Sequence, residues 1–320
     1  MKATLVLSIL TLAFQVAAQP GLDKKNTETI IQNKIKSRMQ YDDSYIDGKQ
    51  ISKNAKTSYI KYNKLGNVIE QITYKAKDTL TLELYEYNSL GNRIEYTKHS
   101  GGSLIIAYKK LSTYDKNNNL IMETGYNGTE NFKNIYEYDN DNRLIKIEYY
   151  LEENLLDEKR TFINAGNKTT VNVYNATGNL TSKIGLTHDK NDNLVEELTY
   201  GGNDQVIEKK NYTYDANNDL LEEVKYRLDK FYYKITYRYD NQGNITEMDE
   251  ENPNEGSYIK KTYKYDNKGN LTEFSWRRRL SDDFSTKTFT YDNKNICTGV
   301  VTYYPSTKFK VLTRYTYEFY

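Results

Sequence analysis

Apolar and polar residues alternate with a period of two over most of this chain. Stretches such as "YEYD" (136–139), "YTYD" (212–215) and "YRYD" (237–240) place tyrosines at positions i and i+2, which lie on one face of an extended strand. Turn-forming residues interrupt the alternation roughly every 10 to 13 residues, and helix signals are few. The pattern predicts an all-β chain of short strands joined by tight turns.

One unit of sequence recurs along the chain. It consists of a strand ending in Tyr-(Asp/Asn), a turn such as "DNKGN" (266–270), and a second strand that begins with an aliphatic residue. Asp side chains bond turn amides, and Gly or Asn accepts the left-handed conformation that short hairpin loops require. We identify eleven copies, the last followed by a truncated twelfth, at Tyr41, Tyr62, Tyr87, Tyr114, Tyr138, Phe162, His188, Tyr214, Tyr239, Tyr265, Tyr291 and Tyr317; Phe162 and His188 mark degenerate copies.

A second, looser turn returns the chain to the next copy. Gly- and Asn-rich segments fall there, at 101–102, 127–128, 201–204 and 252–256. At 174–180 ("YNATGNL") the second turn has the signature of the first, which indicates that both turns do the same geometric job. The sequence therefore predicts hairpin after hairpin.

The repeat predicts about 22 or 23 strands in one sheet. We expect a continuous antiparallel β-hairpin array that forms a long twisted, coiled or partly wrapped sheet, because open sheets rarely exceed about ten strands without curling. Tyr ladders pack one face, and Glu opposite Lys or Arg covers the other. The aromatic C-terminal strand, "RYTYEFY" (314–320), is an edge that pairs with the N-terminal strand, a second copy or a partner.

Three segments divide the chain. Residues 1–18 have a basic start, an apolar run and small residues before position 19, which predicts a secretory signal peptide without a lipid-anchor cysteine. Residues 19–34 are predicted to be a polar leader or cap, and 35–320 the repeat domain. No later apolar run reaches the length of a membrane span. We therefore expect an exported protein of the periplasm, cell surface or extracellular space.

Composition excludes some classes of protein. The formal net charge is +1 over 320 residues, which leaves no electrostatic footprint for nucleic acid. The single cysteine, Cys297, cannot form an internal disulfide. The 33 tyrosines, strong strand formers with a large apolar body, argue against disorder in an otherwise polar chain.

The repeat resembles the YD repeats of the Rhs family. Its Tyr-Asp, the following x-x-Gly-Asn-(Leu/Ile) and the downstream Glu match best in the copies at Tyr239 and Tyr265, and the match covers residues 35–320. The chain resembles short, exported, stand-alone YD-repeat proteins of the Bacteroidota type. The resemblance implies wrapped repeat arrays and carbohydrate binding. The proline-rich self-cleavage motif of the toxin-delivering members has no counterpart in this sequence.

Catalysis and metal binding have weak support in the sequence. His188 replaces a ladder tyrosine, and Cys297 replaces a post-turn aliphatic residue without a nearby histidine, so both favour packing over chemistry. The Asp and Asn oxygens at 240–243 resemble a calcium loop, but the EF-hand spacing and its distal Glu are absent. We expect no enzyme activity, metal or cofactor.

Candidate ligand contacts lie where the repeat is interrupted. The only tryptophan precedes an arginine run, and two tyrosine pairs are adjacent, so that one member of each pair is expected to face away from the other. The candidates are Trp276, Arg277, Arg278, Arg279, Tyr232, Tyr233, Tyr303 and Tyr304. They favour a non-enzymatic module that binds carbohydrate, an acidic glycan included, or a protein partner at the cell surface. The alternative is a structural or assembly component of a larger Rhs-like or surface complex, whose end strands pair with another copy or with a larger Rhs-like partner.

Overall fold

The computed structural model describes residues 20–76, 78–152, 154–278 and 283–320, with side chains from residue 25 onward. The described residues form helix α2 (Pro20–Gln32), a short 3-10 turn η1 (Pro305–Thr307) and a sheet of 22 strands. The strands are β1 (Ile35–Ile46), β2 (Lys49–Tyr62), β3 (Val68–Lys75), β4 (Asp78–Tyr87), β5 (Arg93–Ser100), β6 (Ile105–Tyr114), β7 (Leu120–Tyr126), β8 (Asn131–Tyr138), β9 (Leu144–Leu151), β10 (Leu155–Ala165), β11 (Lys168–Asn175), β12 (Leu180–His188), β13 (Leu194–Tyr200), β14 (Val206–Tyr214), β15 (Leu220–Arg227), β16 (Lys230–Tyr239), β17 (Ile245–Asn252), β18 (Ser257–Tyr265), β19 (Leu271–Arg278), β20 (Ser285–Tyr291), β21 (Cys297–Tyr304) and β22 (Phe309–Phe319).

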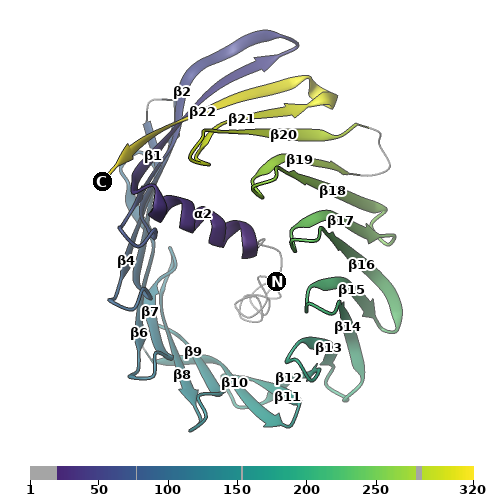
Figure 1. The fold of residues 1–320 in the computed structure, drawn as a ribbon. Coiled ribbons are helices and arrows are strands. Elements are labelled where there is room, and N and C mark those ends of the chain that lie inside the picture. Colours follow the sequence, from purple (N-terminus) through teal and green to yellow (C-terminus); the bar gives the residue numbers. More distant parts are fainter. Residues whose placement is uncertain (1–19, 77, 153, 279–282) are drawn as a thin grey trace.

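The sheet is a continuous antiparallel meander that closes on itself. Each strand pairs with the next one along the chain. The last strand, β22, pairs with β1 over nearly its whole length, from Phe309 opposite Ile46 to Phe319 opposite Ile35. Figure 1 shows the resulting ring of strands. The predicted hairpin array and its strand number are confirmed.

The expectation of an open or partly wrapped sheet is wrong, because the ring is complete. Of the three predicted partners for the C-terminal edge, the N-terminal strand is the one found. The backbone groups of β1 and β22 that face each other are thereby used within the chain. Edge-strand association with a second copy, expected as a possible interaction, has no unpaired strand edge left for it in the described part of the chain.

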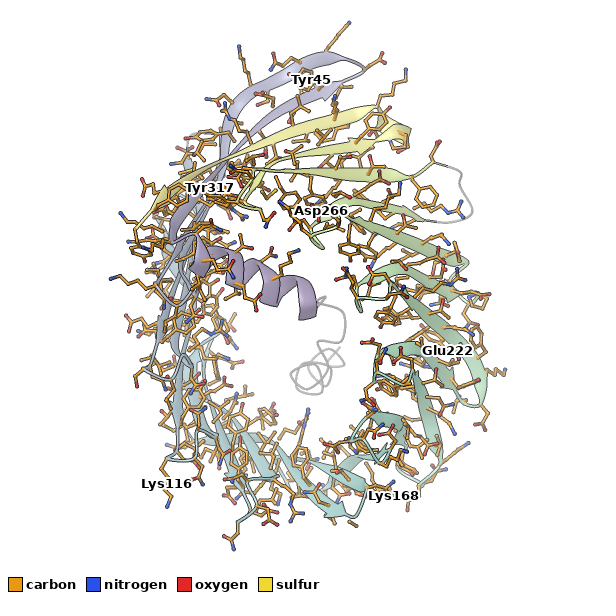
Figure 2. The ribbon with its side chains drawn as sticks, in the orientation of Figure 1. Tyr45, Lys116, Lys168, Glu222, Asp266 and Tyr317 are labelled. Atoms are coloured by element: carbon orange, nitrogen blue, oxygen red, sulfur yellow. The ribbon has the colours of Figure 1, made fainter. Side chains whose placement is uncertain are left out.

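Residues 20–32 of the predicted leader form a helix, α2, that lies inside the ring (Figure 1). Its Ile30 packs against a buried cluster of Ile35, Tyr62 and Ile296. Nearer the N-terminal end of the helix, Lys25 Nζ donates a hydrogen bond to the carbonyl of Lys268 in the turn between β18 and β19, at 2.5 Å. Asp266 and Tyr317, labelled in Figure 2, both border the space that α2 occupies. The helix therefore lies inside the ring and contacts β1, β2 and turns of the last hairpins.

The two faces of the sheet can be assigned from this helix. Since α2 lies inside the ring and contacts Tyr62, the face that carries the final tyrosine of each first strand is the inner face. Alternation then places Tyr237 and its cross-strand partner Met248 on the same face, where both are buried. Most buried apolar side chains lie here, because the concave side of a curved sheet brings side chains closer together.

In most copies, the first turn of the repeat has the predicted chemistry; the copy at Phe162 instead turns directly between Ala165 and Lys168, which pair with each other. In the turn at 240–244, the Asp240 carboxylate accepts hydrogen bonds from the backbone N–H groups of Gln242 and Asn244, at 2.8 and 2.9 Å. The fourth turn residue has a positive φ, as at Gly243 (80°), and Asn or Asp replaces Gly there in other copies. The second-type turn at 175–179 makes the same bonds, as its sequence predicts.

Tyrosine hydroxyl groups connect neighbouring repeats. The final tyrosine of a first strand donates to the carbonyl of the first residue in the preceding copy's second strand, about 20 residues earlier. The bonds, 2.5 to 3.2 Å long, join Tyr87 to Val68, Tyr114 to Arg93, Tyr138 to Leu120, Tyr214 to Leu194, Tyr239 to Leu220, Tyr265 to Ile245, Tyr291 to Leu271 and Tyr317 to Cys297. Phe162 and His188, the residues at this position in the degenerate copies, have no hydroxyl group to make this bond.

The recurring glutamates pair with cations on the outer face, as predicted. Glu95 lies 2.9 Å from the Lys109 ammonium, and Glu247 lies 2.7 Å from that of Lys260. The same holds for Glu70, Glu196, Glu222 and Glu273, which pair with Lys61, Lys209, Lys234 and Lys264. Charged pairs therefore cover the outer surface at these positions.

The copy predicted at Tyr41 is wrong. Strand β1 continues past Tyr41 to Ile46, and the chain turns only at Asp47 and Gly48, both with positive φ. No Gly or Asn follows Tyr41 closely enough to take the left-handed turn position. The first hairpin of the repeat type therefore begins at Tyr62.

Residues 1–18, the predicted signal peptide, lie outside the described residues. In the described part of the chain, no helix has the length and apolarity needed to cross a membrane.

Candidate ligand-binding surface

Five aromatic side chains form a continuous cluster on the inner face, at β18 to β22. Tyr263 stacks on Phe274 and Phe274 on Trp276, each with ring centroids 5.0 Å apart. Trp276 meets Tyr304 edge to face at 5.7 Å, and Tyr304 stacks on Phe309 at 5.9 Å. These residues are called the Trp276 cluster below.

Strand register explains the cluster. The turn at 266–270 places Phe274 directly opposite Tyr263, and Trp276 follows two residues later on the same face. The partner of Trp276 on β20 is Ser285, whose small side chain leaves room for Tyr304 of β21 to reach Trp276. Such aromatic pairs stabilise a sheet by about 0.5–1.5 kcal/mol each beyond their buried area.

Two lysines flank the stacked rings. Lys261 lies directly opposite Trp276, and Lys287 lies directly opposite Phe274. Both lysines and all three of Tyr263, Phe274 and Trp276 are partly exposed. Burial raises the pKa of the Tyr263 hydroxyl, so the ring stays neutral at physiological pH. The surface thus combines partly exposed aromatic rings with cations and neutral hydroxyl groups.

A second inner-face aromatic cluster lies on β4 to β8. Tyr85 stacks on Tyr96 at 5.1 Å, and contacts continue through Tyr108 to Phe132. A Cβ atom at Gly125, opposite Phe132, would lie 2.8 Å from its ring, so glycine lets the ring lie over β7. Burial and the Glu83 carboxylate raise the pKa of Tyr96 to about 12. Tyr85 and Tyr96 both donate to Glu83, which ties this cluster into a local network.

The arginine run beside Trp276 is divided between the two faces. Arg277 is opposite Lys260 on the outer face, with its guanidinium 4.8 Å from the Phe284 ring centroid. Arg278 is exposed on the inner face at the end of β19. Arg279 lies outside the described residues. Trp276 and Arg277 therefore do not form one surface, because adjacent residues of a strand point to opposite sides.

The two tyrosine pairs behave differently. Tyr303 lies on the outer face, 38% exposed and opposite Lys310, whereas Tyr304 belongs to the Trp276 cluster. Tyr232 and Tyr233, however, contact each other with ring centroids 6.1 Å apart. The expectation that they face away from each other is wrong. A bulge leaves Tyr232 without a cross-strand partner, and bulges break the alternation of side chains.

Tyr232 and Tyr233 are held by acidic and basic neighbours. The Tyr232 hydroxyl donates to Glu255 at 3.2 Å, and Arg227 lies 4.9 Å from its ring centroid. Tyr233 donates to Glu223, and burial together with that carboxylate raises the pKa of Tyr233. Tyr232 and Tyr233 therefore lie on a different strand from the residues of the Trp276 cluster. Their hydroxyl groups are already hydrogen-bonded within the sheet.

The surroundings of the histidines and the cysteine favour structural roles over chemical ones. His99 Nδ1 lies 2.9 Å from the carbonyl of Leu104 in its own turn, and His188 is opposite Leu194. Burial raises the pKa of the Cys297 thiol, which disfavours the nucleophilic thiolate. Among the residues that the structure describes, no three His, Cys, Asp or Glu side chains gather as a metal site.

Sequence reasoning identified Trp276 and Tyr304 but missed their neighbours. Tyr263 and Phe309 occupy ordinary repeat positions, and the repeat pattern does not distinguish Lys261 or Lys287 from other lysines. Counting outward from the turn at 266–270 gives the pairs Tyr263–Phe274 and Lys261–Trp276. Cross-strand register was therefore the signal available in the sequence.

No family model matches the chain, and no curated protein matches it. Among solved structures, the chain is similar to TcdB2-TccC3 without its hypervariable C-terminal region (12% identity, TM-score 0.29, 81% of this chain and 19% of that chain). It is also similar to a Tc holotoxin pore of Photorhabdus luminescens (11%, 0.21, 80% and 19%) and to a porin-like protein of Bacteroides uniformis (12%, 0.33, 89% and 98%). The chain spans about a fifth of the toxin chains it matches. At these values the likenesses assign neither a family nor a function.

Proposed function

We propose that this chain is an exported, non-enzymatic YD-repeat protein of the Rhs family that binds carbohydrate at the Trp276 cluster. The observation that carries the proposal is the cluster itself. It joins the only tryptophan to four other aromatic rings on one face. Tryptophan and tyrosine are enriched at binding surfaces because each offers a rigid apolar body with a polar tip.

The neighbouring groups suit a sugar. The apolar C–H face of a pyranose ring packs on an aromatic side chain, and its hydroxyl groups need donors and acceptors nearby. Lys261, Lys287 and Ser285 supply such groups at the positions directly across from Trp276 and Phe274. An extended polymer would contact several rings at once, which increases its apparent affinity.

The alternative, a structural or assembly component, has less support. It relies on strand edges that pair with another copy or with a larger partner. The pairing of β1 with β22 uses both edges within the chain. A structural or assembly role also gives no reason for the aromatic surface that the described residues form on the inner face.

A glycan array probed with the purified protein tests the proposal. We expect binding to at least one class of glycan, and a loss of about 30-fold or more with Trp276→Ala, because aromatic hot-spot residues contribute about 2 kcal/mol or more. Trp276→Phe keeps the stack with Phe274 and should retain part of the affinity.

Tyr303→Ala is the matched control. It removes an exposed aromatic ring from the outer face, next to Tyr304 in sequence, and should leave binding unchanged. Circular dichroism establishes that each variant is folded. Absence of binding to every glycan, or an equal loss in Trp276→Ala and Tyr303→Ala, would refute the proposal.

A further inference from the structure

Lysines on the inner face normally have an acidic partner. Lys98 lies opposite Glu83 and Lys210 lies opposite Glu197, with ammonium-to-carboxylate distances of 3.4 and 3.3 Å. The pattern recurs for Lys110 with Glu123, at 2.5 Å, and for Lys225 with Glu208, at 2.9 Å. Charge on this face is therefore balanced within the sheet at these strands.

Lys261 and Lys287 depart from that pattern. The cross-strand partners of Lys261 are Met248 and Trp276, and those of Lys287 are Phe274 and Thr302. Neither lysine forms an ion pair with any residue that the structure describes. The positions that hold glutamate beside other inner-face lysines are occupied here by an apolar, an aromatic or a hydroxyl side chain.

The inner-face acid on the neighbouring strand β17 does not compensate. Glu250 faces inward on β17, opposite Ile259 and two residues from Met248, so it is only diagonal to Lys261. No ion pair joins them within the described residues, whereas Lys260, on the outer face of the same strand, pairs with Glu247 and Asp249. The lysines without an acidic partner on β18 and β20 thus lie on the face that carries the Trp276 cluster.

We propose that the Trp276 cluster binds an anionic polysaccharide, whose carboxylate or sulfate groups pair with Lys261 and Lys287 while its sugar rings pack on the aromatic side chains. This inference rests on the proposed carbohydrate function and names the class of ligand. The two lysines flank the stacked pair Phe274–Trp276 on neighbouring strands, one on each side. A polymer that carries charged groups on alternate sides of its backbone would meet both lysines. Partly buried ammonium groups gain more from an anion than fully exposed ones do, because screening by water is weaker.

Two matched ligand pairs test the inference. Polygalacturonate and its fully methyl-esterified form share one backbone and differ in carboxylate charge; dextran sulfate and dextran differ in sulfate. Titration calorimetry with the purified protein should give at least tenfold tighter binding of the anionic member in one pair. Which pair responds distinguishes a carboxylated from a sulfated ligand.

Variants locate the effect. The double variant Lys261→Met/Lys287→Met should lose about tenfold or more in affinity for the anionic polymer and bind its neutral counterpart as well as the parent does. The control Lys264→Met removes the same kind of charge from the outer face of β18, where the side chain is 68% exposed, and should keep the preference. Binding of the anionic polymer should also weaken with added salt in the parent and in the control, but much less in the double variant.

The possible outcomes separate this inference from the function it rests on. Equal binding of both members of each pair, with loss in Trp276→Ala, would overturn the anionic class and leave the carbohydrate function standing. No binding of any polymer would remove both. Tight binding of poly-glutamate that survives Trp276→Ala would overturn the inference in favour of an acidic peptide.

Discussion

At the scale of single residues, the tyrosine that precedes each turn does two jobs. Its ring packs on the inner face, and its hydroxyl donates to a carbonyl of the preceding copy, as Tyr239 does to Leu220 at 2.7 Å. Burial raises the pKa of Tyr239 to about 12, so the donor remains protonated over the physiological range. The Tyr-Asp signature is thus a device that joins one hairpin to the next.

Tyr239→Phe should therefore lower the stability of the sheet, while the aromatic side chain still fills its position. We expect a loss of about 1 kcal/mol in the free energy of unfolding, the usual net contribution of such a hydrogen bond. Urea unfolding followed by circular dichroism measures it. Tyr226→Phe is the control, since no hydrogen bond of the Tyr226 hydroxyl is found among the described residues and its ring contacts Phe231. An equal effect of the two substitutions would contradict the proposed role of the hydroxyl.

At the scale of elements, the turns are the part most fully specified by local sequence. The bonds from Asp240 to the N–H groups of Gln242 and Asn244 depend only on residues within the turn. Asn63 and Asn88 make the same bonds in their own copies. An acceptor oxygen is therefore the requirement, and a charge is not.

Asp240→Ala should cost about 1–2 kcal/mol in the free energy of unfolding, because two backbone donors lose their acceptor, whereas Asp240→Asn should cost much less. Although burial acts to raise it, the side chain and backbone of Asn244 hold the pKa of Asp240 below its ordinary value. A lowered pKa in the folded state gives stability that is present above the unfolded-state pKa and is lost as the pH falls through the folded-state pKa.

Unfolding midpoints measured between about pH 2 and pH 7 check both points. The difference in unfolding midpoint between the parent and Asp240→Ala should narrow at the acidic end. The difference between the parent and Asp240→Asn should vanish or change sign there. Equal losses in the two variants at neutral pH would show that the turn does not depend on the acceptor.

Element-scale reasoning from sequence succeeded where spacing is regular and failed where it is not. Strand number, both kinds of turn and the outer glutamate pairs followed from the repeat. The copy at Tyr41 was misplaced because Tyr-Asp alone does not make a turn without a left-handed position after it. The relation of Tyr232 to Tyr233 was missed because a bulge depends on the partner strand, which the repeat pattern does not contain.

At the scale of the whole molecule, the repeat pattern does not predict that the sheet closes into a ring. Each repeat specifies its pairing with the next, and closure depends on the sum of 22 small rotations. A ring of 22 strands needs the sheet to bend by about 16° per strand about the ring axis, and this bend depends on how the strands tilt and stagger together. A few degrees more or less at each strand would leave the sheet open. The helix α2 adds contacts inside the ring, at Ile30 and Lys25, that no repeat encodes.

Closure also explains why the sequence identifies only half of the proposed binding surface. The Trp276 cluster draws on β18 to β22, and its orientation toward the inside follows from the ring rather than from any one hairpin. Sequence pointed to the interrupted repeat at Trp276, but the charge beside it comes from Lys261 and Lys287 in regular copies. The site is thus a property of register and curvature together.

The single tryptophan offers the most direct test that the inner face binds carbohydrate. Trp276 is the only tryptophan in the chain, so its fluorescence reports on the proposed site alone. Titration with a polymer that the protein binds should change the emission saturably, with the same midpoint as calorimetry, and should protect Trp276 from quenching by acrylamide. Saturable binding by calorimetry with unchanged emission and unchanged quenching would place the ligand elsewhere and contradict the account.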